Sequence, residues 1–167
     1  EQVNPVALKA AKAPHIAAEQ EGRRLLASRL AGLIRGTLMT PADVYLVEGA
    51  GGWYVPLNER ETLANLVKDL QIPVILVVGM RLGCLNHAIL SARAIQLDGV
   101  RVAGWIANCV DPDFGSHLDG AELDANVATL QGMLSAPCLG VIPHSPNLDV
   151  ATLAASLQTD LLLKPYL

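Results

Sequence analysis

The chain has 167 residues, of which 51% are hydrophobic and 17% are charged, and its formal net charge at pH 7 is -4. This composition excludes an intrinsically disordered protein, because disordered chains are poor in apolar residues and rich in charge. The acidic balance argues against a nucleic-acid partner, whose binding surface would carry a basic stripe. The length suits one domain with a substantial core, and we expect residues 1–167 to form a single domain.

Cysteine usage and hydropathy predict a cytoplasmic protein. Cys84, Cys109 and Cys138 are widely separated and fit neither a disulfide framework nor a zinc-binding spacing, which favours a reducing compartment. No apolar run approaches the ~20 residues that span a bilayer. The first residues also lack the basic and apolar regions of a signal peptide. We therefore expect no membrane partner.

The order of apolar patterns predicts an α/β fold. Apolar residues at helical spacing precede each of four apolar runs, and a further helical pattern closes the chain. The runs are continuous rather than alternating, which is typical of parallel strands buried on both faces. Strands that alternate with helices predict a doubly wound parallel sheet. The predicted strands are 44–47, 74–78, 102–107 and 138–142, and the predicted helices lie around 26–38, 63–70, 88–97, 123–134 and 153–162.

A glycine-rich segment, Glu48-Gly49-Ala50-Gly51-Gly52, follows the first predicted strand. A carboxylate at this place offers a hard oxygen ligand to a divalent cation, and glycines let backbone amides approach phosphate oxygens. The alternative is a sharp strand-to-loop turn in which Glu48 is solvated. The segment by itself leaves both interpretations open.

Ligands of such a sheet bind outside the carboxyl ends of the strands, so the residues that follow each strand are candidates. The side-chain amide of Asn108 can read the edge of a purine base, or it closes its strand as an Asx turn. In the loop after the second strand, Asn86 can simply cap the following helix, or the glycine brings main-chain groups close to a ligand or a neighbouring subunit. Cys84 is interpreted as a small turn residue rather than a nucleophile. Arg81 can bind an anion or be a solvated loop charge, and His144 can pack on a bound ring.

Several stretches, in this order along the chain, resemble the ATP-dependent dethiobiotin synthetases. The most specific is Leu82-Gly83-Cys84-Leu85-Asn86-His87 after the strand-like Pro73–Gly79. The other matching stretches are Pro14–Ile16, Val47–Trp53, Ala103–Asn108 and Gly140–Pro143. The resemblance implies a sheet of the phosphate-loop NTPase type. The phosphate loop itself, G-x-x-x-x-G-K-S/T, occurs nowhere in the sequence.

The resemblance also implies roles for individual residues. Glu48 would be a Mg²⁺ ligand, and three residues after it would line the ATP phosphates: Gly49, Ala50 and Gly51. The nucleotide base would contact Asn108, Cys109, Pro143, His144 and Ser145. The substrate would contact the loop formed by Gly83, Cys84, Leu85 and Asn86, which would reach across the interface of a homodimer. Cys109 stands where the family often has Asp, and Arg81 stands where Lys is familiar.

The implied reaction is the ATP- and Mg²⁺-dependent carboxylation and ring closure of 7,8-diaminopelargonate with CO₂, which gives dethiobiotin in biotin synthesis. The sequence begins downstream of the family's phosphate loop, so we expect an N-terminally incomplete domain whose catalytic residues precede it and which alone lacks synthetase activity. One alternative is a non-catalytic homologue without a phosphate loop that serves as a binding or dimerisation module. A second alternative is a ParA/MinD-like or cobyrinate-amidating relative. The sequence of the 82–87 loop argues against this alternative.

Overall fold

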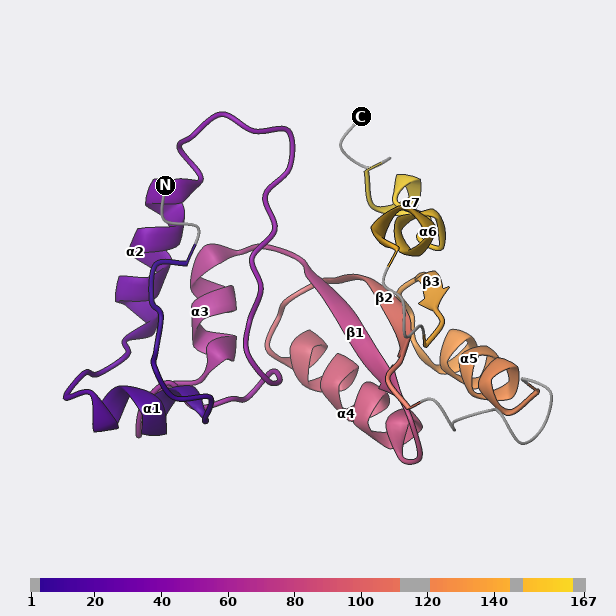
Figure 1. Cartoon of the computed structure of the whole chain (residues 1–167), viewed down its shortest axis with the longest axis horizontal. Helices are drawn as coiled ribbons and strands as arrows, with labels where there is room; N and C mark the ends of the chain where they lie inside the picture. Colours follow the sequence, from indigo (N-terminus) through magenta and orange to yellow (C-terminus); the bar gives the residue numbers. More distant parts are fainter. Residues whose placement is uncertain (1–3, 112–120, 145–148, 164–167) are drawn as a thin grey trace. The chain divides into compact units, whose positions relative to one another are not determined.

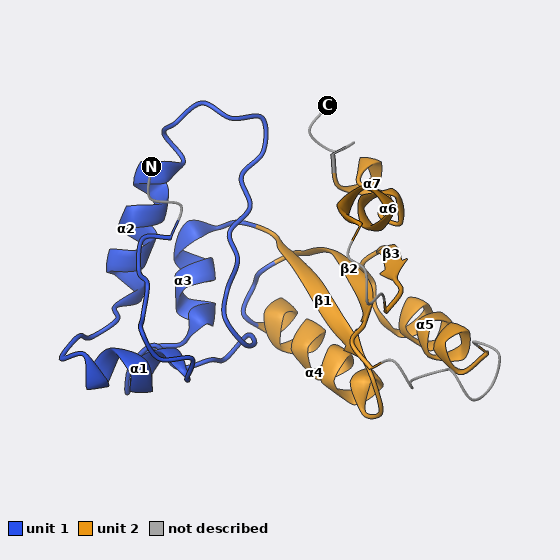
Figure 2. Ribbon diagram, viewed as in Figure 1, with its two compact units in different colours: residues 1–72, 98–100 blue, residues 73–97, 101–167 orange. Residues whose placement is uncertain are grey.

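The computed structural model describes residues 4–111, 121–144 and 149–163. The chain forms two compact units, which Figure 2 shows in different colours. Unit 1 comprises residues 1–72 and 98–100, and unit 2 comprises residues 73–97 and 101–167. The single domain expected over residues 1–167 stays a prediction.

Unit 1 is helical and contains α1 (Pro14–Gln20), α2 (Ala27–Thr37) and α3 (Leu63–Leu70). The predicted helices around 26–38 and 63–70 are confirmed. The helix α3 begins at a capping box, in which the Thr62 backbone N–H donates to Asn65 Oδ1 at 2.8 Å, and it ends at Gln71 in the left-handed conformation. A small core joins these helices and consists of Ala18, Leu25, Ala27, Ala31, Leu57 and Leu66.

The predicted strand at 44–47 is wrong. Residues 44–49 have no regular secondary structure, and Val44 and Leu46 are 56% and 83% exposed. An apolar run becomes a buried parallel strand only where a neighbouring strand supplies hydrogen bonds and other layers cover its faces. Among the described residues nothing pairs with this run. Glu48 therefore follows an irregular segment instead of a strand end.

Unit 2 is a three-stranded parallel sheet with helical crossovers, as Figure 1 shows. The strands lie in the order β1-β2-β3, with α4 connecting β1 to β2 and α5 connecting β2 to β3. The predicted α/β class, the parallel sheet and the three strands after the first are confirmed. The elements are β1 (Val74–Met80), α4 (Cys84–Leu97), β2 (Val102–Cys109), α5 (Ala121–Met133), β3 (Cys138–Ile142), α6 (Val150–Ala155) and α7 (Asp160–Leu163).

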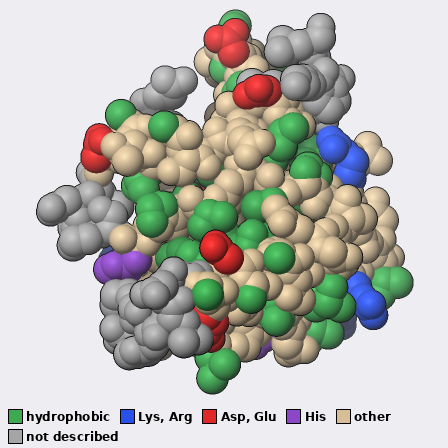
Figure 3. All heavy atoms as spheres, turned by 90° about the vertical axis from the view of Figure 1, so that its right-hand side faces the viewer, with side chains coloured by type: hydrophobic (Ala, Val, Ile, Leu, Met, Phe, Trp, Pro, Cys, Tyr) green, Lys and Arg blue, Asp and Glu red, His purple; other side chains and the backbone are tan. Residues whose placement is uncertain are grey.

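The core of unit 2 lies between one face of this sheet and the helices α4 and α5. Trp105 and Leu130 are fully buried there. The strands β2 and β3 depend on Gly104, because a Cβ at that position would lie 2.6 Å from Leu139 Cγ. On the other face of β1, Val77 is 57% exposed. Exposed apolar side chains are also visible across the face of the molecule in Figure 3.

The predicted closing helix at 153–162 is two short helices, α6 and α7. Between them Leu157 forms an isolated antiparallel bridge with Gly140 of β3, and the Gln158 backbone N–H donates to the Leu139 carbonyl at 2.7 Å. Gly140 is needed for this approach, since its Cβ would lie 2.1 Å from the Ser156 carbonyl oxygen. Hydrogen bonding to β3 therefore interrupts the helical pattern.

Candidate functional site

The carboxyl ends of the three strands of unit 2 bring most of the predicted site residues to one edge of the sheet. Asn108 and Cys109 end β2, and Pro143 and His144 follow β3 directly. The loop that contains Gly83 follows β1 and leads into α4. The predicted gathering of these residues at one edge is thus present in unit 2. Ser145 lies outside the described residues.

Asn108 occupies the central strand between Gly79 of β1 and Ile142 of β3. Its side chain is half-buried, and its amide makes no hydrogen bond within the described part of the chain. The neighbour at position 79 carries no side chain, and the Val110 side chain lies over it, since a Cβ at Gly79 would be 3.4 Å from Val110 Cγ2. The free donor and acceptor of the Asn108 amide fit the edge of a planar base.

The implied contact of Cys109 with the nucleotide base stays a prediction. The Cys109 side chain points into the core of unit 2 and is 8% exposed, so its thiol lies away from the face that carries Asn108. Burial raises the pKa of the Cys109 thiol, and a hydrogen bond from the His144 backbone N–H opposes that rise. The Cys109 thiol therefore lies near the backbone of His144. Pro143 and His144 themselves are exposed.

The loop at 83–86 forms the beginning of α4, and this corrects the predicted capping role of Asn86. The helix begins at Cys84, and the His87 backbone N–H bonds the Gly83 carbonyl at 3.3 Å, so Asn86 lies in the first turn. Gly83 itself has a φ of +90°, which favours glycine. The Cys84 side chain is buried, with its sulfur 3.9 Å from Asn126 Oδ1. Of this loop, Gly83 and Asn86 face solvent and Leu85 is half-buried.

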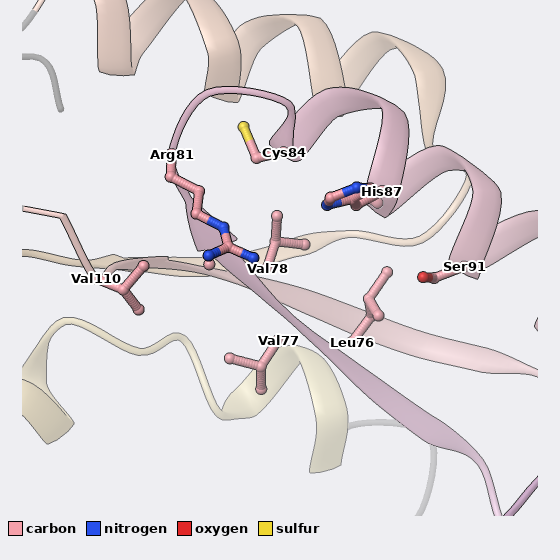
Figure 4. A pocket seen from close by; sticks show the side chains of 10 residues that line it. Leu76, Val77, Val78, Arg81, Cys84, His87, Ser91 and Val110 are labelled. Atoms are coloured by element: carbon pink, nitrogen blue, oxygen red, sulfur yellow. The ribbon is translucent and has the colours of Figure 1, made fainter. Parts of the chain in front are cut away.

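A hollow of about 420 Å³ lies between β1 and the start of α4. The side chains of Arg81 and His87 point into it, and Ser91 lies one turn further along the helix (Figure 4). Its apolar lining on the side that faces α4 comes from Leu76 and Val78 of β1. A cationic group beside an apolar lining, at the N-terminus of a helix, suits a carboxylate on an aliphatic chain.

The glycine-rich segment belongs to unit 1. Glu48 is exposed, and its carboxylate has no hydrogen bond or ion pair within the described chain. Gly51 has a φ of +82°, and a Cβ there would lie 2.7 Å from Val55 Cγ2. The backbone therefore makes a tight left-handed turn that only glycine fits. A free carboxylate beside this turn matches the needs of a hydrated divalent cation next to phosphate. Glu48 belongs to no cluster of three or more metal-ligating side chains among the described residues.

One polar cluster beside this segment was missed from the sequence. The Trp53 indole Nε1–H donates to Asp98 Oδ2 at 2.8 Å, and Lys68 Nζ lies 3.0 Å from Asp98 Oδ1. These hydrogen bonds, with that of Trp53 the stronger, lower the pKa of Asp98. The Asp98 hydrogen bond and charge raise the pKa of Tyr54. The only local signal for Asp98 is an Asp-Gly turn, which says nothing of a partner 45 residues away.

The comparison with known proteins assigns the family. The family model described as an AAA domain, which belongs to the phosphate-loop NTPases, matches residues 1–152. A protein of Cellvibrio japonicus named ATP-dependent dethiobiotin synthetase is 58% identical over 86% of this chain and 60% of its own length. One of the same name from Marinobacter nauticus is 46% identical over 99% of this chain and 68% of its own length. The chain belongs to the dethiobiotin synthetase family.

A third relative of this name, from Pseudomonas paraeruginosa, is 52% identical over 94% of this chain and 66% of its own length. The chain therefore spans between 60% and 68% of the length of these three curated relatives. No helix in the described residues is long and apolar enough to cross a membrane.

Proposed function

We propose that this chain is part of an ATP- and Mg²⁺-dependent dethiobiotin synthetase, which carboxylates 7,8-diaminopelargonate with CO₂ and closes the ureido ring. The observation that carries the proposal is the exposed, unpartnered Glu48 carboxylate next to the left-handed turn at Gly51. Family membership supplies the reaction class, since the relatives are named as ATP-dependent dethiobiotin synthetases.

Glu48 would hold Mg²⁺, and the backbone at Gly49, Ala50 and Gly51 would face the ATP phosphates. A bound Mg²⁺ neutralises the charge that builds up on phosphate oxygens during phosphoryl transfer. The free carboxylate is available for this ion without breaking a hydrogen bond of the protein. The turn at Gly51 keeps side chains away from the phosphates, because only a residue without Cβ fits against Val55.

Asn108 would read the adenine ring from the end of β2. Its amide is free and lies next to Gly79, and Pro143 and His144 leave the sheet beside it. Ser145 is included in this group by resemblance. Cys109 would act through the backbone of His144, since its own side chain is buried in the core.

The substrate carboxylate would bind at the start of α4. Exposed backbone amides at a helix N-terminus bind anions, and the guanidinium of Arg81 adds a positive charge over the hollow. Cys84 and Leu85 would contribute main-chain atoms, while Gly83 and Asn86 are exposed to a ligand. We propose that this site is completed across a homodimer interface in the cytoplasm.

A chimera tests the reaction. The chain would be joined to the N-terminal part of the Cellvibrio japonicus relative, and dethiobiotin formation from diaminopelargonate, CO₂, ATP and Mg²⁺ would be measured by mass spectrometry. We expect ATP-dependent product. Glu48→Gln should lower kcat/KM roughly 100-fold, the size of effect seen when one charge-stabilising group is lost from an active site.

Glu19→Gln is the matched control, because Glu19 is an exposed carboxylate of unit 1 whose side chain has no partner in the described chain. It should leave the rate unchanged. A folded chimera that binds ATP but forms no dethiobiotin would contradict the proposal and favour the non-catalytic binding module. Unchanged turnover in Glu48→Gln would contradict the proposal that Glu48 is a Mg²⁺ ligand.

A further inference from the structure

The backbone that leaves the glycine-rich segment is held far more firmly than the backbone that enters it. Residues 44–51 make no hydrogen bond to other parts of the described chain. Immediately after them, the Val55 backbone N–H bonds the Gly52 carbonyl at 3.2 Å, and the Leu63 N–H bonds the Val55 carbonyl at 2.9 Å. The position of the segment is therefore determined at its exit.

Trp53 is the side chain at this exit, and Asp98 is its anchor. The two oxygens of the Asp98 carboxylate are engaged by separate donors, Trp53 Nε1–H at 2.8 Å and Lys68 Nζ at 3.0 Å. The Asp98 side chain is 20% exposed, so water competes weakly for these donors. The Trp53 ring also contacts the Tyr54 ring, with centroids 6.5 Å apart and planes tilted by 55°.

We propose that Asp98 is a positioning residue that fixes the glycine-rich segment through Trp53. Because Trp53 directly follows Gly52, holding its indole restricts the backbone whose turn at Gly51 faces the phosphates in the proposed function. Lys68 neutralises the Asp98 carboxylate on the side away from the indole, so the anchor adds no unpaired negative charge near bound phosphate. This role rests on the proposed function for its effect on ligand binding, but its effect on the segment itself is independent of any ligand.

The test uses NMR spectroscopy of the 167-residue chain. In Asp98→Asn and Trp53→Phe, the Gly51 and Gly52 amides should become more mobile in heteronuclear relaxation. Hydrogen exchange of the Val55 amide, which bonds the Gly52 carbonyl, should rise roughly ten-fold, as expected for losing one charge-assisted hydrogen bond. The double variant should show no more than Trp53→Phe alone, because Asp98→Asn weakens the same hydrogen bond that Trp53→Phe removes. The Trp53 indole N–H signal should move in Asp98→Asn, whereas that of the buried Trp105 should stay in place.

Asp69→Asn is the matched control, since Asp69 is an exposed carboxylate on α3 whose side chain has no partner among the described residues. It should leave both glycine amides unchanged. The amides of Ala31 and Leu66, in the core of unit 1, report whether a variant remains folded. If those core amides are intact and Gly51 and Gly52 do not respond in either variant, the positioning role is wrong.

Mn²⁺ separates this role from the proposed function. In the wild type, Mn²⁺ should broaden the amide signals of Glu48 and Gly49, and its affinity should fall roughly three- to ten-fold in Asp98→Asn because the segment is less ordered. Absent broadening in the wild type, with a clear glycine response to Asp98→Asn, would contradict the metal role and support the positioning role. Broadening in the wild type, with the same Mn²⁺ affinity and the same mobility of Gly51 and Gly52 in Asp98→Asn, would support the metal role and contradict the positioning role.

Discussion

At the scale of single residues, the turn at Gly51 makes the sharpest prediction. Gly51→Ala places a Cβ 2.7 Å from Val55 Cγ2 in a backbone with a φ of +82°. We expect the variant to lose about 1–3 kcal/mol of local stability, because a left-handed conformation is strained for any residue with a Cβ and Val55 must also move. Hydrogen exchange of the Val55 and Leu63 amides, whose bonds follow the turn, measures this loss.

Gly52→Ala is the control for this prediction. A Cβ at Gly52 meets nothing within 4 Å, and its φ is not positive. The Gly52 variant should therefore exchange at the wild-type rate. Equal exchange in the two alanine variants would show that the turn at Gly51 has no special conformation in solution.

The sequence indicates which residue types of the candidate site could bind a ligand, but not which residues hold them in place. Glu48 and Asn108 could be singled out because a carboxylate and an amide next to apolar runs and glycines are unusual in sequence. Asp98 could not, since its partners Trp53 and Lys68 are distant along the chain and any exposed turn can contain an aspartate. Resemblance alone predicts that Cys109 contacts the base, whereas strand alternation turns its side chain to the opposite face from Asn108.

At the scale of elements, prediction succeeded where local patterns suffice. Helical spacing located α2, α3, α4 and α5, and the run at 138–142 matches β3 residue for residue. The run at 44–47 is just as apolar, yet it is irregular. Strand formation depends on a partner that the local sequence does not specify, whereas a helix satisfies its own backbone hydrogen bonds.

The helix α6 depends on its cap and should be sensitive to pH. Asp149 accepts hydrogen bonds from the Thr152 side chain and from the Thr152 and Ala151 backbone N–H groups, and these bonds lower the pKa of Asp149. A carboxyl with a lowered pKa contributes stability above its ordinary pKa, and that stability is lost as the pH falls through the folded value. We expect amide protection in α6 to decline in that acidic range.

Replacing the cap should have the same effect at neutral pH. Asp149→Ala removes the acceptor of the Ala151 and Thr152 backbone N–H groups, so these amides should lose their protection from hydrogen exchange at every pH. Asp160→Ala is the matched control, because Asp160 begins α7 without a side-chain hydrogen bond in the described chain. If amide protection in α6 still declines in acid after Asp149→Ala, then a group other than Asp149 controls this pH dependence.

At the scale of the whole molecule, the chain contains two cores, and the predicted single domain requires them to unfold together. One core joins the helices of unit 1, and the other lies between the sheet and the helices α4 and α5 in unit 2. Local patterns predict many of the helices and strands that form the two cores but not the coupling of these cores, because cooperativity depends on the free energies of opening each unit. The composition and length that favoured one domain say nothing of those free energies.

Leu130→Ala decides between one cooperative domain and two. Leu130 is fully buried in α5, and removing its side chain should cost about 2–5 kcal/mol through lost burial and a residual cavity. In a single cooperative domain, the globally exchanging amides of both units lose that same amount of protection, including Ala31 in unit 1 and Trp105 in unit 2. Met133→Ala, on the same helix but 56% exposed, should change stability by less than about 0.5 kcal/mol. Loss of protection confined to unit 2 in Leu130→Ala would overturn the single domain, since a cavity in one unit would then leave the stability of the other untouched.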